Sequence, residues 1–204
     1  MAIIRPARVS DARGIARVYV DTWRDTYAGL IPVPALVGLS HRRLTQIWAE
    51  ELARPASGQV VVIANDAASG IVGFGSCGKM RDDALLYDAL PYKGEVFTLY
   101  VLPDFQGQGI GRRLLRRLFA TLSARGMNSA VIWVLAGNPA RFFYHTMGGK
   151  LTAVREERFW GVDLREWAYG WTDLKTTFAP SGQRMAPRQT PARLSGTRPG
   201  YPAS

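Results

Sequence analysis

The stretch VFTLYVLPDFQGQGIGRRLL, residues 96–115, decides the fold of this chain. It opens with an apolar run rich in β-branched and aromatic residues, which predicts a strand. Glycines then occupy every second position, at Gly107, Gly109 and Gly111. A glycine-rich turn that opens a helix presents backbone amides without intrahelical partners, and the glycines let an anion approach the chain closely. The apolar residues that follow recur at helical spacing and predict a helix with one buried face: Ile110, Leu114, Leu115, Leu118 and Leu122.

Two common phosphate-binding motifs do not fit this turn. A P-loop requires Gly-x-x-x-x-Gly-Lys-Ser/Thr, a string that the sequence lacks. A Rossmann site requires Gly-x-Gly-x-x-Gly directly after its strand and an acid at the end of the next strand, whereas LPDFQ intervenes here and the next apolar run, residues 129–135, has no acid. The remaining pattern is Gln-x-x-Gly-x-Gly, at Gln106, Gly109 and Gly111. It predicts that backbone amides, the helix dipole and Arg112 bind a diphosphate without a metal.

Hydrophobic periodicity divides the remainder of the chain into strands and helices. Strands are predicted at 2–9, 59–65, 71–78, 95–102, 129–135, 151–160 and 165–171, the last two joined around GVD at 161–163. Helices are predicted after the N-caps Ser10, Ser40 and Asn138 and over 109–125, with a proline-broken connection at 30–38 and a loop at 79–93. The order is β-α-α-β-β-β-α-β-α-β-β. Hairpins flanking a central β-α-β unit predict an α/β (α+β) fold, a mixed sheet with helices on both faces.

The composition favours one globular domain followed by a basic tail. The chain has 204 residues, of which 47% are hydrophobic, enough for a substantial core. Residues 1–175 are expected to form the domain. From Thr176 onward the sequence is rich in Pro, Gly, Ser, Ala and Arg, so residues 176–204 are expected to form a flexible basic tail. The net charge of +10 favours anionic ligands, whose kind charge alone does not identify.

Cysteine and histidine are scarce, which argues against disulfides and metal sites. Cys77 is the single cysteine, and His41 and His145 are the two histidines, so no metal is expected. One free thiol, no apolar signal segment and no apolar run near the ~20 residues of a membrane span predict a cytoplasmic protein without a membrane span. Cys77 is expected to pack within a strand, because no paired histidine is evident that would activate its thiol.

The glycine turn resembles the signature of the GNAT superfamily of N-acetyltransferases, Gln/Arg-x-x-Gly-x-Gly/Ala between a strand and a helix. LYVLPDFQGQGIGRRLL, residues 99–115, is similar to it, and GNPARFFYHTMGG, residues 137–149, is similar to the Asn…Phe-Tyr-x-x-x-Gly segment that follows. WRDTYAGLIP, residues 23–32, resembles the first helices of a bacterial subgroup. The resemblance covers residues 2–174 in element order. It implies a mostly antiparallel sheet whose central parallel pair splays apart at a bulge.

The resemblance implies acetyl-CoA as the co-substrate. Backbone groups of Leu99, Tyr100 and Val101 would pair with its pantetheine arm as if it were an extra strand, and Asn138 would contact it. A backbone N–H of Tyr100 or Val101 would polarise the acetyl carbonyl, as an oxyanion site does. The diphosphate would be bound by the residues of the turn: Gln106, Gly107, Gln108, Gly109, Ile110, Gly111 and Arg112.

Two residues are candidates for proton transfer. The resemblance makes Tyr144 the proton donor to the departing thiolate, and the alternative is an aromatic ring packed under its helix. Glu95 begins the central strand, and alternation predicts that it shares a face with Leu99 and Val101. Its position is similar to that of a glutamate that takes the amine proton in some family members. The alternative is a solvated carboxylate at a strand end.

The identity of the acceptor amine stays open at this level. Trp23 and Tyr27 share one helical face, where they serve core packing or form an aromatic wall of the acceptor site. The loop acids Asp82, Asp83 and Asp88 could attract a cationic amine or only solvate the loop. An antibiotic, a polyamine, an amino acid and a protein N-terminus all remain candidates.

The predicted reaction is direct attack of a primary amine, carried by a small molecule or a peptide, on acetyl-CoA in a ternary complex. A non-catalytic acyl-CoA-binding sensor is the alternative. Nucleic-acid binding by the tail ranks lower, because the tail has a single aromatic residue, Tyr201. A homodimer is an expectation from the family alone.

Overall fold

The computed structural model describes residues 1–54, 58–81, 91–178 and 192–195. Within this part the strands form one sheet in the order β1-β2-β3-β4-β5-β7-β6-β8. The strands are β1 (Ile3–Pro6), β2 (Val60–Asp66), β3 (Gly70–Lys79), β4 (Gly94–Val101), β5 (Ala130–Leu135), β6 (Lys150–Phe159), β7 (Val162–Trp171) and β8 (Ala192–Ser195). The helices are α1 (Ala12–Thr26), α2 (Val33–Val37), α3 (His41–Leu52), α4 (Ile110–Ala124), α5 (Ala140–Thr146) and α6 (Leu174–Thr177), with 3-10 turns at Val9–Asp11 and Pro103–Phe105.

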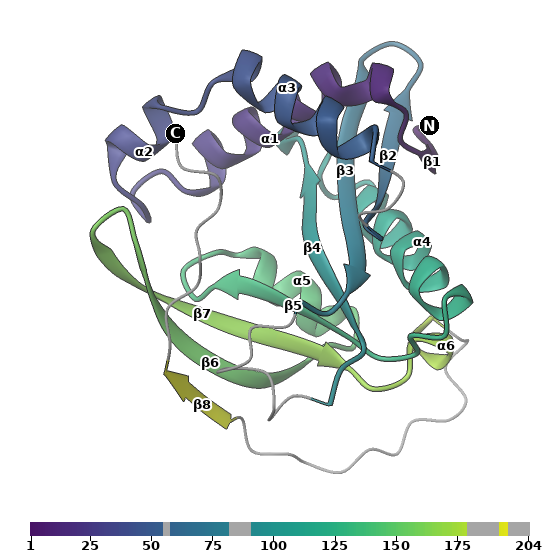
Figure 1. Cartoon of the computed structure of the whole chain (residues 1–204), viewed down its shortest axis with the longest axis vertical. Coiled ribbons are helices and arrows are strands. Elements are labelled where there is room, and N and C mark those ends of the chain that lie inside the picture. Colours follow the sequence, from purple (N-terminus) through teal and green to yellow (C-terminus); the bar gives the residue numbers. More distant parts are fainter. Residues whose placement is uncertain (55–57, 82–90, 179–191, 196–204) are drawn as a thin grey trace.

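The central strands β4 and β5 run parallel and separate almost at once. Their pairing is limited to Gly94 with Ala130 and Glu95 with Val131. Directly beyond this contact β4 has a bulge at Phe97. Ser76 of β3 pairs with Thr98 and the next residue of β3 pairs with Val96, so Phe97 has no partner in the register. The two strands then diverge, as Figure 1 shows. The splayed central pair and the bulge implied by the family resemblance are both confirmed.

Helices cover both faces of the sheet, as the sequence predicts (Figure 1). The predicted apolar stripe of α4, including Leu114 and Leu118, is fully buried against one face together with Tyr144 of α5. On the other face, α1 and α3 bury Ile15 and Trp48 against Phe74 of β3. The sheet around β3 is therefore enclosed from both sides, while the wedge between β4 and β5 opens into the cavity described below.

Several local expectations need correction. Ser10 does not cap α1, because it lies within a 3-10 turn and α1 begins after Asp11. Asp11 instead accepts hydrogen bonds from Arg5 and from the backbone of Arg8, at 2.7–2.8 Å, and the Arg5 guanidinium lowers the pKa of the Asp11 carboxyl. The connection at 30–38 contains a short helix, α2, which begins with a proline in its first turn.

The hairpin between β6 and β7 turns one residue earlier than predicted. Its loop is Trp160–Gly161, with φ of 48° and 81°, and Phe159 pairs directly with Val162. Positive φ at both loop residues is typical of the two-residue turn that matches strand twist. A left-handed conformation is unusual for a tryptophan, so this turn places Trp160 at a defined point at the tip of the hairpin.

The loop acids Asp82, Asp83 and Asp88 lie outside the described residues. The expectation of a flexible tail over 176–204 also falls mostly outside them. Of the tail, the structure describes the end of α6 and the strand β8, whose backbone pairs in parallel with β6.

Candidate active site

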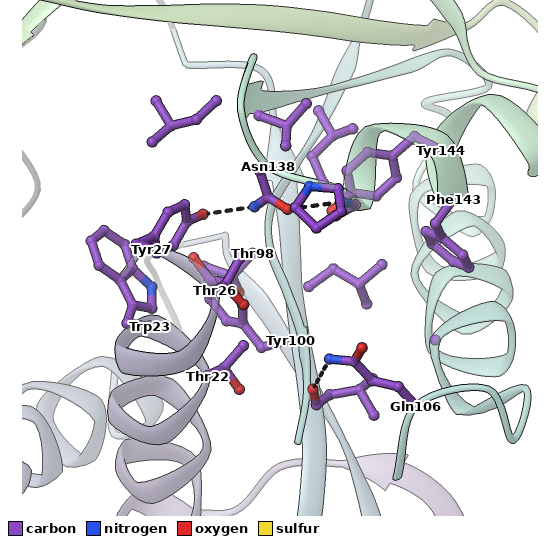
Figure 2. A pocket seen from close by; sticks show the side chains of 18 of the residues that line it. Thr22, Trp23, Thr26, Tyr27, Thr98, Tyr100, Gln106, Asn138, Phe143 and Tyr144 are labelled. Atoms are coloured by element: carbon purple, nitrogen blue, oxygen red, sulfur yellow. Dashed lines mark hydrogen bonds between the residues drawn. The ribbon is translucent and has the colours of Figure 1, made fainter. Parts of the chain in front are cut away.

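A cavity of about 670 Å³ occupies the wedge between β4 and β5. Its lining comes from the C-terminal part of α1, from β4 and β5, from the glycine turn, from the start of α5 and from the β6–β7 hairpin. Figure 2 shows side chains from α1, β4, the glycine turn and α5 around this space. Segments far apart in the sequence therefore meet at one site, with the glycine turn on the β4 side and α5 on the β5 side.

The glycine turn has the geometry of an anion-binding site. Gly107 and Gly109 have φ of 72° and 74°, and α4 begins directly afterwards at Ile110. The first α4 amide bonded to a backbone acceptor is that of Arg113, which donates to Gly109 at 3.1 Å. The amides preceding it are the helix N-terminal donors that lack intrahelical acceptors. Together with the helix dipole, they fit a diphosphate without a metal.

The two glutamines of the turn stabilise its shape through their side chains. The Gln106 side-chain amide donates to the carbonyl of Val101 at 3.0 Å, drawn as a dashed line in Figure 2. The Gln108 side-chain amide donates to the carbonyl of Asp104 at 3.1 Å. Arg112, in the first turn of α4, lines the cavity. Both glutamine side chains are thus engaged in hydrogen bonds within the turn.

The predicted pantetheine residues Leu99, Tyr100 and Val101 line the cavity along β4. They pair with β3 on one side, whereas the pairing of β4 with β5 ends at Glu95. Alternate backbone groups of a strand point to opposite neighbours, so part of this segment faces the opened wedge. An extended ligand could pair there as an added strand.

Tyr144 and Asn138 lie on the β5 side of the cavity. Tyr144 is 4% exposed, lines the cavity and packs edge-on against Trp171. The N-cap of α5 is Pro139, one residue later than predicted. The Asn138 side chain still accepts from the backbone of Ala140, the first residue of the helix, at 2.8 Å, and it donates to the Tyr27 hydroxyl at 3.1 Å. Both contacts are visible in Figure 2.

Trp23 and Tyr27 pack in the core and also border the cavity. Both are buried in the core that covers the α1 face of the sheet. Both also line the cavity, with their ring centroids 4.7 Å apart. The Trp160 ring from the β6–β7 hairpin meets Trp23 edge-on at 6.1 Å. Aromatic side chains from α1 and from a distant hairpin therefore face the same space.

Glu95 does not share a face with Leu99 and Val101, so that expectation is wrong. The bulge at Phe97 shifts the alternation by one residue, and Val96 joins Leu99 and Val101 in the core under α4. The Glu95 carboxylate is 1% exposed and accepts three hydrogen bonds from Arg81, between 2.5 and 3.3 Å. Glu95 is not among the residues that line the cavity.

The cavity also has lining residues that the sequence analysis did not assign to the site, among them Thr22, Trp133, Trp160 and Glu166. Trp133 was read only as part of a buried strand, and Trp160 was expected to end one. Glu166 directly follows Arg165 near the start of a predicted strand, and charged residues of this kind are mostly exposed. No local signal marks it as buried, since its burial depends on the pairing of β7 with β5 and β6.

Cys77 is a packing residue, and its thiol is expected to be inert in the native protein. It is fully buried under α4, and burial raises the pKa of its thiol to about 12. At pH 8 only about one thiol in 10⁴ would be ionised. We expect an aromatic disulfide reagent to release no chromophore from the folded protein within minutes and one equivalent after denaturation. Rapid stoichiometric labelling of the folded protein would contradict this placement.

Metal-ligand clusters and membrane-spanning helices are two further features with functional meaning. No group of three or more His, Cys, Asp or Glu side chains among them could hold a metal ion. No helix in this part of the chain is long and apolar enough to cross a membrane.

Comparison with known proteins identifies the family. The model of the acetyltransferase (GNAT) family matches residues 15–148. The chain is 34% identical over 174 residues to YuaI, an uncharacterized N-acetyltransferase of Bacillus subtilis, covering 85% of this chain and 95% of that one.

Two further relatives show what such chains bind or modify. An L-methionine sulfoximine/L-methionine sulfone acetyltransferase of Pseudomonas aeruginosa is 32% identical, with 71% of this chain and 77% of that protein covered. The acetyl-CoA complex of YncA from Salmonella typhimurium superimposes with a TM-score of 0.59 at 25% identity, covering 93% of this chain and 99% of that one. With its glycine turn, splayed strands and family match together, the chain belongs to the GNAT family of acetyltransferases.

Proposed function

We propose that this acetyltransferase moves an acetyl group from acetyl-CoA to a primary amine by direct attack in a ternary complex. One observation carries the proposal. The unpaired amides of the glycine turn, the opened edge of β4 and Tyr144 all border a single cavity. A carrier bound along β4 would therefore present its reactive end between the two diverging strands, with room beside it for an acceptor.

The residues present fit this co-substrate. The turn from Gly107 to Arg112 would hold the diphosphate, and the backbone of Leu99, Tyr100 and Val101 would hold the pantetheine arm. Acetyl-CoA supplies a thioester carbonyl that is open to attack. A backbone N–H of Tyr100 or Val101 stabilises the negative charge that develops on that oxygen.

Proton movements are then assigned to particular groups. The Tyr144 hydroxyl can donate a hydrogen bond, and it gives its proton to the sulfur as the carbon–sulfur bond breaks. An alkyl amine titrates near ~10.4, so it must lose a proton before attack. Because Arg81 holds Glu95 away from the cavity, water takes this proton. The second proton, which the nitrogen releases when it becomes an amide, returns to the Tyr144 oxygen and restores the hydroxyl. No covalent acyl-enzyme is needed, and the buried Cys77 thiol could not form one.

The proposal is tested in two stages. Calorimetry first measures whether the chain binds acetyl-CoA. A panel of amines is then incubated with enzyme and acetyl-CoA, while released thiol is recorded and products are identified by mass spectrometry. We expect binding and amine-dependent thiol release with a mass increase of one acetyl group. Tight binding without release for any amine would instead support the non-catalytic sensor.

Gly109→Ala is expected to weaken acetyl-CoA binding at least tenfold. Gly109 has φ of 74°, and a left-handed residue with a Cβ costs roughly 1–2 kcal/mol, so the turn would relax away from the shape that aims its amides at the diphosphate. Calorimetric Kd values for acetyl-CoA provide the measurement.

Gly126→Ala is the matched control for this variant. Gly126 follows the other end of α4, has φ of 79° and has open space where a Cβ would lie. It should show a similar loss of thermal stability with an unchanged Kd. If the two variants weakened binding equally, the effect of Gly109→Ala would reflect general destabilisation and not the anion site.

A further inference from the structure

The charged residues that line the cavity are distributed unevenly. In the described part of the chain they are Arg112, Asp25 and Glu166. Arg112 belongs to the anion-binding turn on the β4 side. Glu166 lies on β7, paired with Leu135 at the end of β5, and Asp25 lies at the end of α1. The side of the cavity away from the turn thus has two carboxylates and, among the described residues, no cationic side chain.

Glu166 is held in place by a buried ion-pair cluster, formed by Arg155, Glu157 and Glu166. The Arg155 Nε donates to Glu166 at 2.7 Å, its Nη2 also contacts Glu166, and Glu157 lies 3.1 Å from the same Nη2. All three residues are at most 3% exposed. One guanidinium is therefore shared by two carboxylates, and only Glu166 among the three lines the cavity.

Two buried polar atoms on the cavity lining have no hydrogen-bond partner among the described residues. They are the Thr22 hydroxyl and the Trp133 indole N–H, in side chains of residues that are 4% and 8% exposed. Buried donors without acceptors are costly and uncommon in proteins. An indole N–H can only donate, so the group that satisfies it must be an acceptor such as a hydroxyl, ether or carbonyl oxygen.

Aromatic rings complete this side of the cavity. Trp23 and Tyr27 approach from α1, and Trp160 is brought against Trp23 by the left-handed turn of the β6–β7 hairpin. Faces and edges of such rings cover an apolar or aromatic body, and their faces also favour a nearby cation.

From these contacts we propose, on the basis of the acetyl transfer proposed above, that the acceptor is a small cationic primary amine with an aromatic or apolar body and no carboxylate. Glu166 binds the ammonium group, the three rings cover the body, and Thr22 and Trp133 meet a neutral oxygen. A carboxylate next to the amine would lie beside Glu166 without a cation to balance it. Arg155 could not balance the charge of that carboxylate, because two carboxylates of the protein already share its guanidinium and it does not line the cavity.

The test compares acceptors that differ by a carboxylate. Tyramine and L-tyrosine share a ring, a hydroxyl and an amine, and L-methionine sulfoximine represents the acceptor named for one relative. With saturating acetyl-CoA, we expect kcat/KM for tyramine to exceed that for both amino acids by at least about tenfold, as one unbalanced charge in a pocket predicts. Equal or higher values for the amino acids would overturn the proposal.

Two isosteric variants test the role of Glu166. Glu166→Gln is expected to raise the KM and the calorimetric Kd for tyramine by about 10–100-fold, the usual effect of a lost charged hydrogen bond, with the Kd for acetyl-CoA unchanged. Glu157→Gln likewise removes one carboxylate charge beside Arg155, but Glu157 lies off the cavity. The KM and the Kd for tyramine should therefore stay within about threefold of the wild-type values. Either variant still leaves Arg155 one carboxylate, which favours folding of both. Equal effects of the two variants would contradict a direct contact.

Failure of this inference can be distinguished from failure of acetyl transfer. If acetyl-CoA binds but no amine is acetylated, the proposal of acetyl transfer fails. The proposal of a cationic amine at Glu166 is then still tested, by calorimetry of tyramine binding to CoA-loaded enzyme. Tyramine binding that depends on Glu166 but not on Glu157 would support it. Absence of tyramine binding would overturn it.

Discussion

Replacing Tyr144 by phenylalanine is expected to lower kcat for acetyl transfer by about 10²–10⁴-fold, the usual contribution of a general acid. Tyr144 is buried at the cavity, where its ring packs against Trp171 and Tyr169. Phenylalanine keeps this packing and removes only the hydroxyl that would donate to the leaving sulfur. The Kd for acetyl-CoA should therefore stay within about threefold. Steady-state thiol release and calorimetry on the same preparation measure both quantities.

Tyr169→Phe is the matched control for this experiment. Tyr169 is 5% exposed, burial raises the pKa of its hydroxyl, and its ring centroid lies 6.1 Å from that of Tyr144, yet it does not line the cavity. Loss of the Tyr169 hydroxyl should change kcat for acetyl transfer by no more than about threefold. Similar losses in the two variants would mean that the pair acts through packing, and Tyr144 would then lose its role as the acid.

The shape of the glycine turn could be predicted from the sequence because its geometry is local. Gly107 and Gly109 adopt a positive φ, which glycine allows, and α4 begins where its predicted apolar stripe begins. The same holds for the start of α5, which differs from the prediction by one residue, since the Asn138 side chain accepts from the first helical amide two residues away. Turn chemistry and helix ends are determined by neighbours in the chain, so one sequence suffices to place them.

The position of Glu95 could not be predicted, because it depends on how two strands pair. Strict alternation from Val101 places Glu95 on the same face, but the bulge at Phe97 reverses this. A bulge is specified by the partner strand and by the twist of the sheet, and it leaves no periodic signal in six residues. Glu95, which was expected at the reaction centre, is thus bound by Arg81 where the pairing of β4 with β5 ends.

The buried cluster of Arg155, Glu157 and Glu166 was hidden for a related reason. Alternating charges on paired strands usually face solvent, yet here they lie under Trp133, whose ring centroid is 3.9 Å from the Arg155 guanidinium carbon. Only the three-dimensional pairing of β5, β7 and β6 brings these groups together. Residues of the proposed acceptor site are accordingly harder to predict from sequence than residues of the glycine turn.

Replacing Arg155 by methionine is expected to lower the free energy of unfolding by about 3–5 kcal/mol, as removal of one partner from a buried ion pair does. Methionine fills much of the same space beside Trp133, but it leaves Glu157 and Glu166 buried without their shared cation. Domains of this size are stable by roughly 5–15 kcal/mol, so the loss should be large in urea denaturation. Arg158→Met on the same strand is the control, because Arg158 is exposed and its pair with Asp163 is 3.9 Å long. It should change stability by less than about 0.5 kcal/mol.

A triple variant separates charge from packing as the cause of that loss. Combining Arg155→Met with Glu157→Gln and Glu166→Gln removes all three charges while keeping side chains of similar length. Because the cost of the single variant comes from uncompensated carboxylates, the triple variant should regain most of the lost free energy of unfolding. It should nevertheless bind tyramine as poorly as Glu166→Gln alone. If the triple variant stayed as unstable as Arg155→Met, the arginine would act through its contact with Trp133, and the cluster would be a packing element with no electrostatic role in shaping the acceptor site.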